Sequence, residues 1–172
     1  MEIRHVRIED ASDLRSIYAP YVTNTAITFE YAVPSVAEFE SRIDKIVQDY
    51  PYLVVEVEGR IVGYAYASPY SERAAYHWAV ELSIYMDESE RGKGLGRLLY
   101  KALEKELLKR GYLRFLACIA LPNDASIQFH QKQGYQQVAH FPNIGYKFHK
   151  WHDIIWMQKS IEGEADSLNG CF

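Results

Sequence analysis

Hydrophobic and polar residues alternate most regularly just before the middle of the chain. From Glu81 to Met86, apolar side chains occupy every second position, which is the pattern of a strand with one buried face. From Gly94 to Arg110, apolar residues instead recur at helical spacing, and Gly111 follows as a typical helix end. A short basic loop with three glycines connects the two segments. The sequence therefore predicts a strand, a loop and a helix in direct succession here.

The same two periodicities locate the other elements of the fold. Strands are predicted at residues 2–8, 52–57, 60–68, 112–120, 135–140 and 151–159. Glu58-Gly59 is typical of a hairpin turn between two of these strands. Helices are predicted after a cap at Asp10, after a capping box at Ser35, and over 125–133, with a kink or break at Pro20. This order predicts a single α/β domain in which helices flank a mixed central sheet.

Composition narrows the class of protein. A chain of 172 residues with 48% hydrophobic and 24% charged residues is ordinary for one soluble domain. Its net charge of −4 argues against a nucleic-acid partner. Because no apolar stretch has the length of a signal peptide or a membrane span, we expect a cytoplasmic protein with no membrane partner.

The two cysteines and the many tyrosines point to simple expectations. Cys118 and Cys171 form neither a disulfide framework nor a metal site, and we expect Cys118 to be buried and a poor nucleophile. No metal site is expected elsewhere either, since His77, His149 and His152 lack the spacing of metal ligands. Several of the 14 tyrosines are expected to line a pocket.

The glycine-rich loop has the features of an anion site. Its glycines allow close approach of a ligand, and the first N–H groups of the following helix lack intrahelical partners at the positive end of the helix dipole. Basic side chains surround these groups: Arg91, Lys93 and Arg97. The spacing fits neither the P-loop nor the dinucleotide fingerprint G-x-G-x-x-G. A plain turn would need only one glycine, so we expect a phosphate or pyrophosphate ligand.

Arg91, Gly94 and Gly96 instead match the pattern R/Q-x-x-G-x-G/A, which resembles the coenzyme A pyrophosphate loop of the GNAT N-acetyltransferase superfamily. A longer set of pieces runs from Tyr66 to Gln158. They are Tyr66-Ala67-Ser68-Pro69, Arg73-Ala74-Ala75-Tyr76-His77-Trp78, Glu81 with Tyr85, Leu121-Pro122-Asn123, His130 before Gly134-Tyr135, Gly145-Tyr146-Lys147 and Trp151-His152-Asp153. Together these pieces resemble the phosphinothricin acetyltransferase family.

The resemblance implies a GNAT fold over residues 1–161, with a mixed, mostly antiparallel sheet, and a flexible tail over 162–172. It implies acetyl-CoA as co-substrate without a metal, and a small amino-acid-like amine as acceptor. It also implies a homodimer, to which the apolar and aromatic segment from Phe141 to Trp156 could contribute.

Two residues receive catalytic roles from the resemblance. Glu81 falls on the general base of the family, because an ammonium must lose a proton before its nitrogen can attack a thioester. The alternative for Glu81 is an ion-paired glutamate at a strand end. His130 falls where many superfamily members use a tyrosine to protonate the departing thiolate, and it could act as general acid or as a partner base. The alternative for His130 is a structural helix histidine.

Coenzyme contacts are implied at three places along the chain. Backbone groups at Ile84, Tyr85 and Met86 would polarise the thioester carbonyl. The pyrophosphate loop comprises Arg91, Gly92, Lys93, Gly94, Leu95, Gly96 and Arg97. Asn123 and Ser126 would contact the pantetheine or a phosphate, although Asn123 is equally a plain helix cap.

Substrate contacts are expected from Phe29, and the resemblance implies them for Arg73 and Tyr76, which match family positions that hold the acidic end of the substrate. Phe29 lies in a segment that could pass over the pocket, and Arg73 offers a bidentate fork for an acidic group. The alternatives are a solvated arginine and a core tyrosine. Where phosphinothricin-resistance enzymes carry lysine and tryptophan, this chain has Ser71 and Tyr70, so we expect a broader or different amino-acid-like substrate.

Two other functions stay open from the sequence. The chain could acetylate a peptide or protein N-terminus, or it could be a non-catalytic acyl-CoA-binding sensor. Retention of both Glu81 and His130 argues against the sensor.

Overall fold

The computed structural model describes residues 1–163; residues 164–172, with Cys171 and most of the expected tail, lie outside the described residues. The strands are β1 (Glu2–His5), β2 (Tyr52–Val57), β3 (Arg60–Pro69), β4 (Ala79–Met86), β5 (Arg114–Ala120), β6 (Gln136–Lys147) and β7 (Lys150–Ser160). The helices are α1 (Ala11–Asn24), α2 (Val36–Val47), α3 (Leu95–Lys109) and α4 (Asp124–Gln131). Short 3-10 turns are η1 (Ile8–Asp10), η2 (Ala74–Tyr76) and η3 (Glu88–Glu90).

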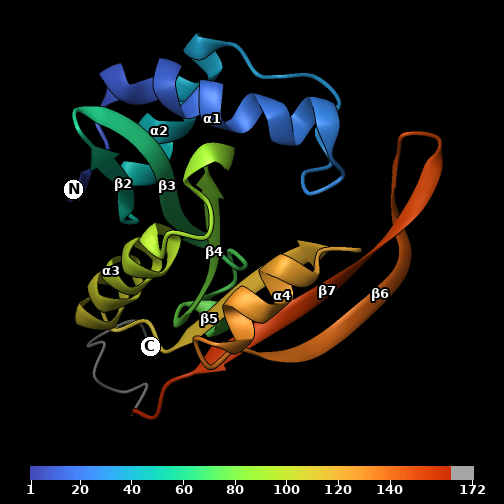
Figure 1. Cartoon of the computed structure of the whole chain (residues 1–172). Helices are drawn as coiled ribbons and strands as arrows, with labels where there is room; N and C mark the ends of the chain where they lie inside the picture. Colours follow the sequence, from blue (N-terminus) through green and yellow to red (C-terminus); the bar gives the residue numbers. More distant parts are fainter. Residues whose placement is uncertain (164–172) are drawn as a thin grey trace.

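The strands form one seven-stranded sheet in the order β1-β2-β3-β4-β5-β7-β6. β4 and β5 are its parallel pair, and the other described neighbours are antiparallel. Helices α1 and α2 lie over β2 and β3, whereas α3 and α4 lie on the opposite side of the sheet (Figure 1). The predicted α/β fold is therefore confirmed.

Each helical layer encloses its own apolar core. Leu99, Leu103 and Leu107 project from one stripe of α3 and pack against the sheet with no exposed surface. Burial of a leucine stabilises a fold by roughly 1.5–3 kcal/mol, so this stripe holds α3 firmly against the sheet. The opposite core is rich in tyrosine and includes Tyr18, Tyr21, Tyr52 and Tyr64.

β4 and β5 pair over only three positions, Ala79–Glu81 with Arg114–Leu116. Beyond Glu81 the remainder of β4 keeps its antiparallel partner β3, but none of the strands within residues 1–163 pairs with its other side. β5 meanwhile continues alongside β7 as far as Ala120. The two central strands therefore separate, and the backbone edge of β4 from Leu82 to Met86 faces this separation.

The structure corrects two predictions about α1. Of the predicted kink or break at Pro20, the break does not occur: the helix continues through the proline, because it buries Ile17 and Tyr18 before it and Tyr21 after it. Tertiary packing thus outweighs the amide that proline lacks. Asp10 does not cap α1 with its side chain. Its carboxylate instead accepts hydrogen bonds from the Arg7 amide at 2.7 Å and from the guanidinium of Arg4 at 2.8 Å.

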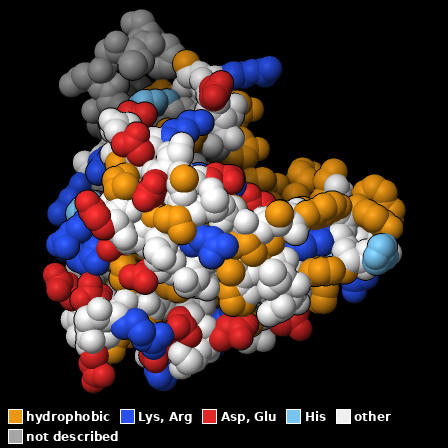
Figure 2. Space-filling model, turned by 90° about the horizontal axis from the view of Figure 1, so that it is seen from above, with side chains coloured by type: hydrophobic (Ala, Val, Ile, Leu, Met, Phe, Trp, Pro, Cys, Tyr) orange, Lys and Arg blue, Asp and Glu red, His pale blue; other side chains and the backbone are white. Residues whose placement is uncertain are grey.

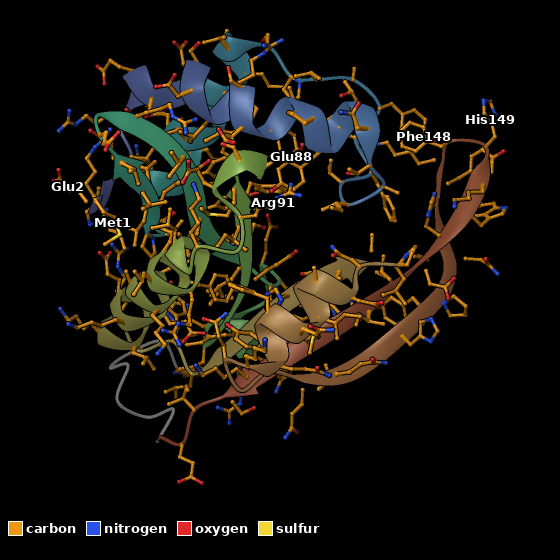
Figure 3. All side chains as sticks on the ribbon, viewed as in Figure 1. Met1, Glu2, Glu88, Arg91, Phe148 and His149 are labelled. Atoms are coloured by element: carbon orange, nitrogen blue, oxygen red, sulfur yellow. The ribbon has the colours of Figure 1, made fainter. Side chains whose placement is uncertain are left out.

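The last hairpin is longer than predicted. β6 reaches Lys147 and β7 begins at Lys150, so the two strands form an arm that projects from the body of the protein (Figure 1). Phe148 and His149 form the turn with positive φ angles of 52° and 60°, and Figure 3 shows them at the tip of the arm. Bulky residues seldom adopt such angles, which explains why the sequence did not predict this turn.

Candidate active site

Glu81 lies on β4 where the strand begins to leave β5. It is half-buried, and it shares a face of the sheet with its strand partners Ser68 and Leu116. Among the described residues Glu81 forms no ion pair, so the alternative of an ion-paired strand-end glutamate is not what the structure contains. Desolvation raises the pKa of its carboxyl group above the ordinary value. A carboxylate of this kind is suited to accept a proton from an amine.

Cys118 lies on the same face, two residues after Leu116 on β5. The prediction that it is buried is wrong: Cys118 is exposed, since β4 has already diverged from β5 at this point. Desolvation by its surroundings, together with the nearby Glu81 carboxylate, raises the pKa of the Cys118 thiol to about 12. The thiol therefore stays protonated near neutral pH and is a poor nucleophile despite its exposure.

The free edge of β4 contains the backbone groups expected to contact a thioester. The Met86 amide donates to the hydroxyl of Tyr21 at 2.9 Å, and that hydroxyl donates to the Met86 carbonyl at 2.7 Å. The Met86 N–H is thus already engaged. Because backbone groups of alternate residues point to the same side of a strand, those of Ile84 also face away from β3. Of the described residues on this side of β4, Ile84 is the one between Leu82, next to the last pair with β5, and Met86, and its amide is the expected donor to a thioester. Tyr85 instead directs its ring into the tyrosine core.

The glycine-rich loop joins this edge to α3. Gly92 and Gly94 have φ angles of +77° and +82°, and a Cβ atom on either would meet no atom within 4 Å. Gly96 lies against β4, where a Cβ atom would come within 3.5 Å of Ile84 and 3.6 Å of Met86. Glycine is therefore needed at the first two positions for backbone shape, while the third brings the start of α3 close to the open edge.

Basic side chains of the loop are held by the acidic turn η3. Arg91 lies 3.7 Å from Glu88, and the two project near the end of β4 (Figure 3). Lys93 forms an ion pair with Glu90 at 3.0 Å. Leu95 and Arg97 occupy the first turn of α3, where amides point outward without helical partners. The loop thus combines exposed basic side chains, amides without helical partners and two glycines with open surroundings, which together suit a pyrophosphate. The neighbouring β4 edge suits the pantetheine part of coenzyme A, which contains amide groups.

His130 is a buried side chain on α4. It is 3% exposed, and both of its ring nitrogens have partners. Nδ1 lies 2.8 Å from the Ser126 carbonyl, and Nε2 lies 3.0 Å from the Tyr100 hydroxyl. Burial lowers the pKa of the imidazole, opposed by the bond to Ser126. A direct acid role for His130 stays a prediction, and it would require one of these bonds to open.

Asn123 acts as the cap of α4, which is one of its two interpretations. Its side chain accepts a hydrogen bond from the Ser126 amide at 3.2 Å, so it caps the helix. The Ser126 hydroxyl lies 3.4 Å from His130 Nδ1, between the buried imidazole and the helix start. Contact of either residue with a coenzyme stays a prediction.

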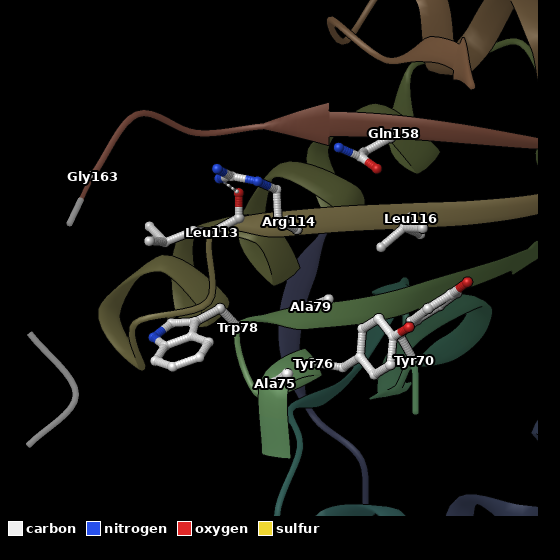
Figure 4. Close-up of a pocket in the computed structure, with 10 residues that line it drawn as sticks. All are labelled: Tyr70, Ala75, Tyr76, Trp78, Ala79, Leu113, Arg114, Leu116, Gln158 and Gly163. Atoms are coloured by element: carbon white, nitrogen blue, oxygen red, sulfur yellow. Dashed lines mark hydrogen bonds between the residues drawn. The ribbon is translucent and has the colours of Figure 1, made fainter. Parts of the chain in front are cut away.

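A cleft of about 490 Å³ opens beside the first residues of β4 (Figure 4). Its lining residues are Tyr70, Ala75, Tyr76, Trp78, Ala79, Leu113, Arg114, Leu116, Gln158 and Gly163. Tyr76 is 42% exposed and packs against Tyr70 with ring centroids 5.3 Å apart, so it is not a core tyrosine. Arg73, at the start of η2, is exposed. The structure therefore places an available cation and a phenol on one loop next to the strand that bears Glu81.

A second cavity of about 390 Å³ lies between α2 and the sheet. Its lining includes Tyr18, Tyr50, Tyr52, Tyr64 and Tyr66, which agrees with the prediction that tyrosines line a pocket. Ser68, opposite Glu81, also belongs to this lining.

Phe29 is fixed by the projecting arm, a relationship that sequence patterns did not reveal. Its ring lies against Gly145, where a Cβ atom would come within 2.1 Å of it, and 6.1 Å from the His152 ring. The ammonium of Lys147 donates to the carbonyls of Val22, Thr25 and Thr28 at 2.7–2.8 Å. The hydroxyl of Tyr31 also bonds to the Tyr146 carbonyl. Arm and loop are thus held as one unit.

Among residues 1–163, no cluster of histidine, cysteine and acidic side chains could hold a metal ion. None of the helices in that range is long and apolar enough to cross a membrane.

Comparison with known proteins gives the family. Residues 3–156 match the model of the acetyltransferase (GNAT) domain. The chain belongs to this family, as its resemblance predicted.

Curated relatives within the family are named for small amino-acid-like substrates. The phosphinothricin N-acetyltransferase of Streptomyces viridochromogenes is 33% identical over 162 residues, covering 94% of this chain and 88% of that protein. The L-amino acid N-acyltransferase MnaT of Escherichia coli is 33% identical over 170 residues, covering 96% and 97%.

Solved structures agree with the fold. The phosphinothricin acetyltransferase of Sinorhizobium meliloti, determined in complex with acetyl-CoA, superposes with a TM-score of 0.89 at 33% identity, covering 93% of this chain and 88% of that one. The ribosomal-protein-alanine N-acetyltransferase of Brucella melitensis gives a TM-score of 0.90 at 32% identity, covering 94% and 100%.

Proposed function

We propose that this protein is an acetyl-CoA-dependent N-acetyltransferase that acts on the α-amino group of a small amino-acid-like substrate by direct attack. The observation that carries the proposal is the position of Glu81, a desolvated carboxyl group without an ion-pair partner among the described residues, where β4 separates from β5. Relatives named for phosphinothricin and for amino acids support the substrate class.

Acetyl-CoA supplies the activated acetyl group, and the chain supplies orientation and proton transfer. The loop amides around Gly92 and Gly94, with Arg91 and Lys93, bind the phosphates of the coenzyme. The Ile84 N–H donates to the thioester carbonyl oxygen and stabilises the charge that develops there. Glu81 accepts the proton of the incoming ammonium, directly or through a water molecule, and so frees the nitrogen lone pair. The nitrogen then forms a bond to the thioester carbon while the C–S bond breaks, and the departing thiolate of the coenzyme takes up the second proton that the nitrogen loses.

The acceptor lies on the face that Glu81 shares with Ser68 and Leu116. Arg73 binds its carboxylate or another acidic group through two parallel hydrogen bonds, and Tyr76 contributes a hydroxyl. Phe29 covers it from the loop that the arm fixes. With Ser71 in place of a second cation, a singly charged amino acid suits this corner better than a doubly anionic one.

A second candidate is acetylation of a protein N-terminus. The likeness to the ribosomal-protein-alanine N-acetyltransferase of Brucella melitensis favours it. In this case the cleft of about 490 Å³ lined by Tyr70 and Tyr76 would bind the peptide residues that follow the acetylated one.

The test is thiol release from acetyl-CoA over a panel of amines, with mass spectrometry of the products. The panel contains phosphinothricin, methionine sulfone, methionine sulfoximine, standard amino acids and short peptides. Acetylation of free amino acids or their analogues supports the proposal. Turnover of peptides alone would establish the second candidate, and tight acetyl-CoA binding with no turnover at all would identify a sensor.

We also propose that the protein is located in the cytoplasm and forms a homodimer. Its co-substrate belongs to the cytoplasm, and the arm supplies a surface for a second copy. Large apolar side chains are exposed along it: Val138, Phe141, Ile144, Tyr146, Phe148 and Trp151. Figure 2 shows hydrophobic side chains gathered on a projecting part of the molecule. Such patches on soluble proteins mark association surfaces.

Analytical ultracentrifugation tests the dimer. Trp151, 59% exposed, is replaced by serine, and Leu108→Ser on the outer side of α3 is the matched control. Trp151→Ser is expected to dissociate the dimer, whereas Leu108→Ser leaves it intact. A monomeric wild-type protein at micromolar concentration would refute the dimer.

A further inference from the structure

The hydroxyl of Tyr21 forms hydrogen bonds with backbone groups of β4 that a neighbouring strand would normally bind. Beyond Glu81 no strand in the described part of the chain pairs with the far edge of β4. At Met86 on that edge, the Tyr21 hydroxyl accepts from the amide at 2.9 Å and donates to the carbonyl at 2.7 Å. One hydroxyl group thus makes both hydrogen bonds that a partner residue of an antiparallel strand would make.

The position of this hydroxyl is fixed from several sides. Tyr21 comes from α1, one residue after Pro20, and is 7% exposed. Its ring packs edge-on against Tyr85, with ring centroids 5.1 Å apart, and Tyr85 neighbours Met86 on β4. The hydroxyl therefore cannot leave Met86 without disturbing the tyrosine core.

The Tyr21 ring also contacts the phosphate loop. The guanidinium carbon of Arg91 lies 4.8 Å from the ring centroid, within range of a cation–π interaction. Tyr21 therefore contacts both parts of the coenzyme site, the open β4 edge through its hydroxyl and the basic loop through its ring.

We propose that Tyr21 is a positioning residue for the acyl donor. Its hydroxyl holds the end of the open β4 edge, so that the Ile84 N–H keeps a fixed direction toward the thioester carbonyl. Its ring holds Arg91 on the side of the phosphates. The inference rests on the proposed coenzyme site, and it adds a residue from α1 that lies outside the recognised sequence pattern.

The test removes only the hydroxyl, with Tyr21→Phe, which keeps the ring against Tyr85 and Arg91. Tyr18→Phe is the matched control, because Tyr18 is also a buried tyrosine of α1 and packs edge-on against Tyr85 at 4.9 Å. Its hydroxyl, however, bonds to Thr28 and not to β4. Melting temperatures of both variants establish that they fold.

Two measurements separate positioning from general packing. The first is kcat and KM for acetyl-CoA and for the amine. The second is calorimetric binding of acetyl-CoA and of adenosine bisphosphate, which carries phosphates but lacks the pantetheine and the thioester. Tyr21→Phe is expected to lower kcat/KM for acetyl-CoA and to weaken its binding about three- to tenfold, the usual effect of one hydrogen bond. The KM for the amine and the affinity for adenosine bisphosphate stay unchanged.

Tyr21→Leu extends the test to the ring. Since it also releases Arg91, it is expected to weaken adenosine bisphosphate as well as acetyl-CoA. Unchanged acetyl-CoA binding and kcat/KM in Tyr21→Phe would overturn the proposal. Tighter binding would also overturn it, because the hydroxyl would then compete with the coenzyme for β4. An equal loss in Tyr18→Phe would overturn it too, since the effect would then be one of packing. The binding measurements with acetyl-CoA and adenosine bisphosphate give their result even if the amine acceptor differs from the one proposed.

Discussion

The Tyr100 hydroxyl lies 3.0 Å from Nε2 of His130, inside the core between α3 and α4. Since the Ser126 carbonyl at Nδ1 can only accept, Nδ1 carries the proton and Nε2 accepts from Tyr100. The imidazole is therefore neutral and fully hydrogen-bonded, and its pKa is lowered by burial. The Nδ1 proton lies on the side of Ser126, whose hydroxyl is 3.4 Å from Nδ1, so delivery of this proton to a leaving thiolate would require the bond to the Ser126 carbonyl to open.

Nitrogen NMR of the histidine rings tests this state of His130. At pH 7 we expect the neutral tautomer protonated at Nδ1. Its nitrogen chemical shifts should not change as the pH falls through the ordinary histidine pKa of about 6.5. An imidazolium at pH 7, or a proton on Nε2, would contradict the assignment and restore His130 as a direct acid.

Glu81→Gln is expected to leave the fold intact and to stabilise it at neutral pH. Because the pKa of Glu81 is raised in the folded protein, the folded state retains a proton that the unfolded chain has released. Wild-type stability therefore falls as the pH rises from about 4.5 to the raised pKa, and glutamine removes this loss. Urea unfolding at pH 4 and pH 7 measures the difference between the two proteins, which should grow with pH. A variant less stable than wild type at pH 7 would show that the carboxylate has a stabilising partner.

Gly94→Ala and Gly59→Ala form a matched pair. Both glycines have positive φ angles, +82° and +77°, and at both an added methyl group would meet no atom within 4 Å. Each substitution should cost about 1–2 kcal/mol of stability for the same backbone reason. Only Gly94→Ala should weaken acetyl-CoA binding, since Gly59 lies in the β2–β3 turn. Equal acetyl-CoA affinities in the two variants would remove the loop from the coenzyme site.

Lys147→Met is expected to raise the KM for the amine and to lower stability by about 3 kcal/mol, because it leaves the carbonyls of Val22, Thr25 and Thr28 without their ammonium donor. The loop that carries Phe29 then loses its connection to the arm, whereas the acetyl-CoA site is untouched. Lys150→Met, an exposed lysine at the start of β7, is the control for charge. A KM for the amine that stays at the wild-type value would mean that the loop does not contact the acceptor.

The sequence predicted what depends on neighbours along the chain. The β4–loop–α3 unit followed from alternation, glycine spacing and helical periodicity, and its glycines have the open geometry that a phosphate loop needs. The β2–β3 hairpin followed equally well from Glu58-Gly59. The wider family pattern supplied Glu81, whose lack of an ion-pair partner among the described residues only the fold could reveal.

The sequence did not predict what depends on distant partners. The predicted burial of Cys118 was wrong because it depends on where β4 leaves β5. The predicted break at Pro20 was wrong because side chains on both sides of it pack into the same core. Tyr21 bonds to a residue 65 positions away, and Lys147 to the Val22 carbonyl 125 positions away, so no local pattern could indicate either role.

The most direct test of the proposed mechanism is the pH dependence of kcat/KM for the best amine, measured by thiol release for wild type and Glu81→Gln. We predict that wild-type activity rises with pH as Glu81 and the amine lose their protons. Glu81→Gln should be slower by about a hundredfold or more at pH values between the raised pKa of Glu81 and the pKa of the amine, and the difference should shrink below the pKa of Glu81, where the wild-type carboxyl is protonated too. Equal rates for the two proteins would contradict the assignment of Glu81 as the base.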